Sequence, residues 1–352
     1  MAGTARWLVV VFLDGGNEWQ AMVLQTQGNI GDGLLRRERR PLPTPGPGQL
    51  RLRVAACGVC HTDLHVCAGE LPPRPLPIIP GHQIVGYIDA LGPEHDAALR
   101  LGQRVGVAWL HATCGSCRFC RTGRENLCRL ARFTGYDADG GYASHAIAPA
   151  AFVHPLPERY GDAQAAPLLC AGIIGWRALR RAGVQPGERV GLFGFGASAH
   201  LTLQVLTAWG CPVAVWSRGE SHRRLARALG ASWAGGYEAA APWPLERAIV
   251  FTPAGDTVAQ ALGHLDAGGV VAIASVHLSP LPPLDHDRLL SGEREIRSVT
   301  AATRQDAADF LRVAAALPLE VAVTRFPLAQ AEQALVELRR GHIDGAAVLE
   351  PD

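Results

Sequence analysis

The feature that most constrains the fold is an alternation of apolar, strand-like runs with helical runs in the second half of the chain. In chain order the runs are ERVGLFGFG, ASAHLTLQVLTAWG, PVAVWS, SHRRLARALGA, RAIVFT, AQALGHLDAGG and VVAIAS. Parallel strands need long crossover connections, and these are usually helices. The alternation therefore predicts a parallel sheet covered by helices on both faces.

A glycine-rich turn joins the first strand of this series to the first helix. Gly194 and Gly196 take the first two positions of a G-x-G-x-x-G/A pattern, and Ala199 takes the third. The N–H groups at the start of the following helix would face a pyrophosphate. Glycine-rich turns are common, but the position of this one inside a strand–helix–strand unit predicts a dinucleotide cofactor.

The end of the next strand bears on which nicotinamide cofactor is preferred. Ser217 and Arg218 stand where an NAD-preferring site usually has an acidic residue for the ribose 2′-hydroxyl. NADP(H) is favoured over NAD(H), because no acid would repel a 2′-phosphate and a guanidinium is available to pair with it. Glu220 lies close enough in the sequence to keep NAD(H) as the alternative.

The first part of the chain has a different pattern. Runs such as QLRLRVAAC, HQIVGYIDALG and QRVGVAWL are short and apolar, and Gly and Pro separate them, which predicts an irregular, mostly antiparallel β domain. The pattern changes near Pro167, and 352 residues are enough for two domains. The tail has two helical stretches, the second expected to end at Gly341, followed by a strand-like AAVLE.

The composition excludes several classes of function. A formal net charge of +1 gives no bulk field to attract nucleic acid or an acidic membrane. All 33 basic residues are arginine, which excludes Schiff-base and P-loop lysine chemistry. No apolar run reaches the roughly 18 residues of a membrane span. We expect residues 1–20 to be an N-terminal extension of a cytoplasmic protein, with a targeting peptide around WLVVVFL as the alternative.

Four of the nine cysteines fall together in CGSCRFCRTGRENLC. They are Cys114, Cys117, Cys120 and Cys128. Four thiolates at this spacing suit a closed, tetrahedral structural zinc site. An iron–sulfur cluster is a rival, but there the last spacing is usually x3 followed by Pro, whereas here it is x7 followed by Arg129. A zinc module that binds nucleic acid is a further alternative, which the neutral charge of the chain disfavours.

A second set of ligands is spread along the chain. CGVCHTDLH offers cysteine, GHQIVG offers His82, and PLLCAG offers Cys170. Two thiolates and one imidazole leave the fourth position of a zinc ion open, as catalysis requires. Taken alone, His82 would be interpreted as a buried core histidine, so its assignment as a metal ligand depends on the other motifs.

These motifs, in this order, resemble those of the zinc-dependent medium-chain alcohol dehydrogenases. The resemblance rests on GVCHTDLH, GHQIVG, the four-cysteine cluster, LLCAG, GFGASAH and GHIDGAAVL, and it covers residues 21–350. It implies a GroES-like irregular β catalytic domain at 21–171 and 303–352. A doubly wound Rossmann dinucleotide-binding domain, at 172–302, would be inserted into it.

The resemblance also implies roles for individual residues. By position, Cys60, His82 and Cys170 are similar to the ligands of the catalytic zinc. Asp63 is similar to the acid that hydrogen-bonds the histidine ligand and fixes its tautomer. The metal requirement implied is two Zn²⁺ per chain, one catalytic and one structural.

Four further positions match residues around the reaction. Thr62 and His65 fall on the proton relay between substrate and solvent. His61 falls where the family places a cation near the cofactor pyrophosphate. Trp109 falls on an aromatic wall of the substrate pocket.

The chain departs from the family pattern at several positions. Gln83 stands where the family has an acid near zinc, and Ala346 stands where it has an arginine that contacts phosphate. A threonine that often contacts the nicotinamide is Ile174 here. The second aromatic residue of a narrow ethanol-type pocket is missing around Cys67 and Leu71. We therefore expect a roomier pocket.

The resemblance implies an oxidoreductase that interconverts primary alcohols, medium-chain or aromatic, and their aldehydes by hydride transfer with NADP(H). The alternatives are an NAD(H)-dependent enzyme, a polyol or secondary-alcohol dehydrogenase of the same superfamily and, more remotely, a non-catalytic zinc module. The partners implied are a small-molecule alcohol or aldehyde and further copies of the chain, as a homodimer or homotetramer. Nucleic acid and membranes are not expected partners.

Overall fold

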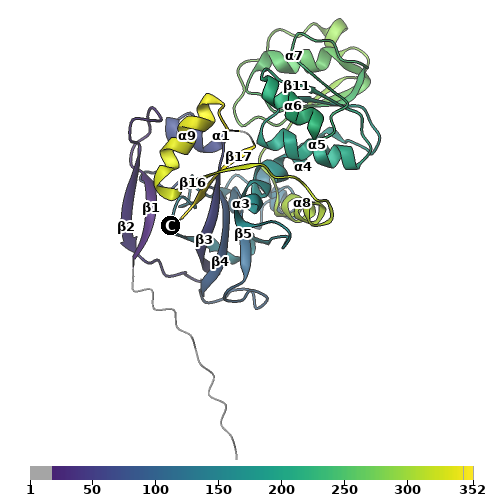
Figure 1. Ribbon diagram of the computed structural model, residues 1–352. Coiled ribbons are helices and arrows are strands. Elements are labelled where there is room, and N and C mark those ends of the chain that lie inside the picture. Colours follow the sequence, from purple (N-terminus) through teal and green to yellow (C-terminus); the bar gives the residue numbers. More distant parts are fainter. Residues whose placement is uncertain (1–17, 344, 352) are drawn as a thin grey trace, which may run out of the picture.

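The computed structural model describes residues 18–343 and 345–351, so most of the expected N-terminal extension lies outside the described residues. The chain forms two lobes (Figure 1). Strand β1 begins at Glu18, three residues before the domain expected from Ala21. Trp19 is buried in the core of this lobe, which is why the strand extends that far.

The middle of the chain forms a six-stranded, all-parallel sheet in the order β12-β11-β10-β13-β14-β15. Its strands are β10 (Val190–Phe193), β11 (Val213–Trp216), β12 (Trp233–Gly235), β13 (Leu245–Val250), β14 (Leu265–Ile273) and β15 (Glu295–Ser298). The helices of this lobe are α4 (Ala171–Ala182), α5 (Ala197–Ala208), α6 (Glu220–Ala228) and α7 (Gly255–Gly263), with a short π-helix η4 (His286–Leu290). The expected parallel sheet is confirmed.

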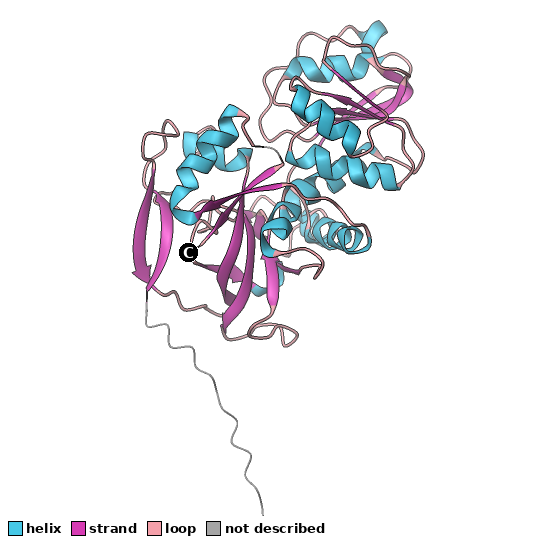
Figure 2. Cartoon of the chain, viewed as in Figure 1, coloured by secondary structure: helices cyan, strands magenta, loops and turns pink. Residues whose placement is uncertain are grey.

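Alternate residues of the central strand face opposite layers of helices. Leu192 packs in one core cluster with α4 and α5, whereas Phe193 packs in another with α7. Because successive side chains of a strand point to opposite faces, helices lie on both sides of the sheet (Figure 2). The strand order changes direction between β10 and β13, the place where α/β sheets bind ligands at the carboxyl ends of their strands.

The other lobe is built on a seven-stranded sheet in the order β16-β17-β3-β4-β5-β9, with β8 also paired to β3. Its strands are β3 (Gln49–Val59), β4 (Gln83–Leu91), β5 (Arg104–Val107), β8 (His145–Pro149), β9 (Val153–Pro155), β16 (Val323–Pro327) and β17 (Ala346–Glu350). Two antiparallel pairs lie beside it: β1 (Glu18–Leu24) with β2 (Leu35–Pro41), and β6 (Leu110–Ala112) with β7 (Arg132–Phe133). The lobe is irregular and mostly antiparallel, as its short runs predict.

Short helices connect these strands. They are α1 (His61–Ala68), α2 (Arg118–Arg121), α3 (Asp162–Ala165) and α9 (Ala331–Arg340), with 3₁₀ turns η1 (Glu125–Leu127), η2 (Ala150–Phe152), η3 (Ala166–Leu169) and η5 (Leu328–Gln330). Helix α9 ends at Gly341, which has the left-handed conformation expected of a C-cap glycine. Among residues 18–343 and 345–351 no helix is long and apolar enough to cross a membrane.

The end of the chain returns to the first lobe. Strand β17 pairs antiparallel with β3, so that Ala347 lies opposite Val59, and α9 packs near α1 (Figure 1). Helix α8 (Arg304–Ala316) instead packs on α4, where a Cβ at Gly172 would lie 2.2 Å from Phe310. One core cluster thus runs across both expected domain limits, and those limits stay a prediction.

Candidate active site

Three side chains from distant parts of the chain converge at the junction of the lobes. Cys60 is the N-cap of α1, His82 immediately precedes β4, and Cys170 lies between η3 and α4. The Sγ atoms of the two cysteines and a ring nitrogen of the histidine all lie within 4.8 Å of one another. Cys60 Sγ is 3.5 Å from His82 Nε2.

Asp63 links the start of α1 to the histidine. Its Oδ2 accepts a 2.8 Å hydrogen bond from the Cys60 N–H, which completes the capping box of the helix, and its Oδ1 lies 3.2 Å from His82 Nδ1. Burial acts to lower the pKa of His82, but the charges of Cys60 and Asp63 raise it to about 10. The carboxylate thus leaves Nε2 of the imidazole directed at the two sulfurs.

The donor set fits a zinc ion with one open position. The pKa of the Cys60 thiol is raised well above its usual value by a hydrogen bond with Cys170, by burial and by the Cys170 charge. Two thiolates crowded in this way need a cation between them, and two sulfurs with one imidazole nitrogen are a set that zinc binds. The remaining side of the group faces a cavity that His82 and Cys170 help to line.

The four-cysteine cluster also comes together. Cys114 Sγ lies 3.6 Å from Cys128 Sγ, and Cys117 Sγ lies 3.6 Å from Cys120 Sγ, with all four sulfurs within 4.8 Å and none in a disulfide. Backbone N–H groups of residues 116 and 117 lower the pKa of Cys114 to about 6. Four converging sulfurs fit a closed tetrahedral site.

The cavity has a volume of about 450 Å³ and a mostly apolar wall. Trp109 lies edge-on to His82, with ring centroids 4.9 Å apart, and stacks on Phe133 at 4.9 Å. Ile174 also lines the cavity. The sequence did not predict a role for Phe133, because this residue lies in β7, outside every motif.

The expected relay residues lie on α1. Thr62 is buried and lines the cavity, and its hydroxyl has no hydrogen-bond partner among the described residues. His65, one turn later, is partly buried, and its Nδ1 lies 2.5 Å from Glu70 Oε2. Its ring is also 5.7 Å from that of His277, from the other lobe. His61, the first residue of α1, is exposed.

The glycine turn has the conformation that its sequence requires. Gly194 has a φ of +94°, where a side chain would be strained and its Cβ would lie 2.8 Å from Thr252. Gly196 is the N-cap of α5, so no side chain caps the helix at this position. A Cβ added there would meet no atom within 4 Å. Ala199 is fully buried against the sheet. The N–H groups at the start of α5 are therefore accessible to an anionic group.

The residues that the sequence assigns to ribose recognition lie at the end of β11. Ser217 is buried, with its Oγ 3.5 Å from His222 Nδ1, and Arg218 is exposed. The Glu220 carboxylate is bound by Arg223 at 2.7 Å and also contacts Arg227. His222 was not expected from the sequence, because no motif marks it.

Two of the noted departures are buried. Gln83 is 2% exposed, and no residue in the described part of the chain hydrogen-bonds its Nε2. Its side chain lies so close to Gly58 that a Cβ there would be 2.7 Å from Oε1. Ala346 is buried at the start of β17.

Comparisons with known proteins agree with this architecture. The family model for the alcohol dehydrogenase GroES-like domain matches residues 46–158. The chain is 49% identical over 335 residues to the Mycobacterium tuberculosis protein named "Probable alcohol dehydrogenase AdhA", covering 94% of this chain and 96% of that protein.

Solved structures give the same result. A thermostable alcohol dehydrogenase from Pyrobaculum aerophilum, determined with cobalt and zinc bound, superposes with a TM-score of 0.86 and 27% identity, covering 95% of this chain and 100% of that one. Acetophenone reductase from Geotrichum candidum, in complex with NAD, gives a TM-score of 0.85 and 26% identity over 95% and 98% of the two chains. The chain belongs to the zinc-dependent medium-chain alcohol dehydrogenases, and it is an oxidoreductase of that family.

Proposed function

We propose that the protein interconverts primary alcohols, medium-chain or aromatic, and their aldehydes, with NADP(H) as the preferred cofactor. The observation that carries the proposal is the apolar, aromatic-walled cavity that Thr62, His82 and Cys170 help to line. A substrate with a hydrocarbon body and one reacting oxygen suits such a wall. A polyol does not, because most of its hydroxyls would be buried without partners.

Cys60, His82 and Cys170 would hold one zinc, and the four-cysteine cluster a second. When bound, the zinc supplies a Lewis acid for the substrate oxygen, and the nicotinamide supplies or accepts the hydride. Asp63 keeps His82 oriented. The apolar wall excludes water and holds the carbon body of the substrate.

Thr62 and His65 would move the proton. Thr62 lines the cavity, and its hydroxyl has no hydrogen-bond partner among the described residues, so it can donate to or accept from the substrate oxygen. His65 lies one turn further along α1, beside the exposed carboxylate of Glu70, and would pass the proton to solvent.

The surroundings of Ser217 support the cofactor preference. Arg223 and Arg227 neutralise Glu220, so this acid offers little repulsion to a 2′-phosphate. Arg218 is exposed, and His222 adds a hydrogen-bonding ring beside Ser217. The NAD complex of acetophenone reductase keeps NAD(H) as the alternative for a chain of this fold.

The test is a comparison of initial rates of benzaldehyde and hexanal reduction with NADPH and with NADH, with and without a zinc chelator. We expect both aldehydes to be reduced, NADPH to be preferred, and the chelator to abolish turnover. A preference for NADH would overturn the cofactor assignment alone. Zinc-replete protein that reduces neither aldehyde would overturn the substrate class.

A further inference from the structure

The cavity wall contains one polar ring that neither the ligand set nor the relay uses. His154 lies in β9, is 7% exposed and lines the cavity. Among the described residues its ring has no hydrogen-bond partner, although a neutral imidazole offers one donor and one acceptor. The ring nitrogens are not fully enclosed by the protein, so a molecule bound in the cavity can reach them and supply the missing partner.

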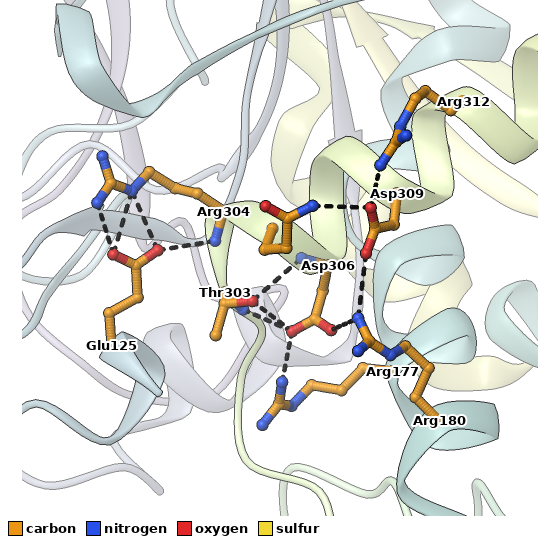
Figure 3. Close-up of polar contacts among 9 residues, drawn as sticks. Glu125, Arg177, Arg180, Thr303, Arg304, Asp306, Asp309 and Arg312 are labelled. Carbon is orange, nitrogen blue, oxygen red and sulfur yellow. Dashed lines mark hydrogen bonds and ion pairs between the residues drawn. The ribbon is translucent and has the colours of Figure 1, made fainter. Parts of the chain in front are cut away.

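An ion pair beside the ring determines which molecule could bind. Arg304 also lines the cavity, and its Nη2 lies 2.6 Å and its Nε 3.0 Å from the two oxygens of Glu125 (Figure 3). The guanidinium also lies over the Phe152 ring, 4.4 Å from its centroid. Glu125 therefore balances the positive charge that Arg304 brings to this part of the wall.

The imidazole itself is uncharged. Burial, followed by the charge of Arg304, lowers the pKa of His154 to about 4. With a neutral ring and a balanced ion pair, this part of the wall has no net charge to attract a carboxylate or a phosphate. It offers hydrogen bonds to a neutral group.

We propose that His154 determines substrate specificity by hydrogen-bonding a neutral polar substituent, a hydroxyl or an ether oxygen, on an otherwise apolar alcohol or aldehyde. The inference rests on the proposed function and deepens it. The apolar wall accommodates the body of such a substrate. Its reacting oxygen faces Cys60, His82 and Cys170, and its second oxygen is hydrogen-bonded by His154. An aromatic aldehyde with a ring hydroxyl or methoxy group has this chemistry.

The kinetic test compares kcat/KM for benzaldehyde with kcat/KM for its three hydroxy and three methoxy isomers. We expect the full-length wild-type protein to favour at least one substituted isomer. In His154→Leu that isomer should lose about tenfold in kcat/KM, as loss of a hydrogen bond worth about 1.4 kcal/mol predicts. Benzaldehyde, which lacks the second oxygen, should lose less, so that the ratio of the two kcat/KM values falls, and His154→Asn should recover part of the preference. His95→Phe, at an exposed turn, is the control for replacing a histidine.

A binding measurement separates this inference from the proposed function. Calorimetric titration of benzyl alcohol and its hydroxylated isomers without nicotinamide involves no turnover, and it should show the same His154-dependent difference in dissociation constant. If the wild type favours no substituted isomer in either assay, or if His154→Leu retains the preference, the inference is wrong. If benzaldehyde is not turned over, the proposed function is wrong. The binding result would still decide the role of His154.

Discussion

Asp63 has two structural tasks at once. One carboxylate oxygen caps the backbone at Cys60, and the other fixes the ring of His82. Because both partners belong to the same ligand set, the carboxylate couples the start of α1 to the position of the imidazole. Loss of this carboxylate should therefore weaken metal binding more than it weakens the fold.

We expect Asp63→Asn to weaken zinc binding at the Cys60, His82 and Cys170 set by 10- to 100-fold, as loss of a partner behind a ligand does. The four-cysteine cluster should keep its zinc. Competition with a chromophoric chelator would resolve the two classes of site. Asp89→Asn, which removes a carboxylate paired with Arg51, is the control. Equal zinc affinity in the two variants would contradict the prediction.

Thr62→Val removes the hydroxyl expected to exchange a proton with the substrate oxygen while keeping the volume of the side chain. We expect kcat to fall by about 100-fold or more, the usual contribution of a positioned proton-transfer group, with a much smaller change in KM. Steady-state kinetics with benzaldehyde would measure both. A kcat within twofold of wild type would show that the proton takes another route.

At the scale of elements, the four-cysteine segment supports a wall of the cavity. Asn126 donates a 2.7 Å hydrogen bond to the Thr300 carbonyl, and Glu125 binds both the backbone and the side chain of Arg304. Between them Ala301 has a left-handed φ of 48°, which is unfavourable for a residue with a Cβ. Contacts from η1 therefore hold the strained turn that leads into α8.

We expect Glu125→Gln to lower the free energy of unfolding by about 2 kcal/mol. Breaking a fully buried pair costs about 3–5 kcal/mol, and part of the Arg304 side chain is exposed, which reduces the loss. Urea unfolding would measure it. Glu295→Gln, in an exposed pair with Arg297, should change stability by less than about 0.5 kcal/mol. Similar losses in both variants would contradict a supporting role for Glu125.

The difference between local and distant contacts explains what the sequence could predict. The turn at Gly194, the helix end at Gly341 and the sulfur cluster depend on neighbours in the chain, and their spacing alone predicts them. The pairing of Glu125 with Arg304 joins residues 179 positions apart, and no periodicity marks either one. Phe133 and His154 could not be predicted as cavity residues for the same reason, since only the folded chain brings them to the cavity.

Across the whole molecule, three buried histidines connect stability to pH. Burial lowers the pKa values of His111, His154 and His200 to about 4, with help from neighbouring arginines at the first two. In the unfolded chain each would titrate near 6.5. As pH falls from about 6.5 toward 4, the unfolded state takes up protons that the native state does not, and stability is lost.

We expect the free energy of unfolding to fall between pH 7.5 and pH 5, with each such histidine contributing up to about 1.4 kcal/mol per pH unit below its unfolded pKa. His200→Leu should flatten this dependence, because the ring is 1% exposed and burial is the main cause of its lowered pKa. Urea unfolding at several pH values would test it. An unchanged slope in the variant would contradict the assignment of His200.

The pairing of β17 with β3 also has a consequence for the order in which the protein is made. Residues 57–59, which immediately precede the first ligand, Cys60, form a sheet with residues 347–349. On the ribosome, the edge of β3 that β17 covers stays open until almost the whole described chain has been synthesised, and open strand edges invite aggregation. Early synthesis of Cys60 therefore does not bring early completion of its site, because the sheet that supports this cysteine cannot close until residues 347–349 have been made.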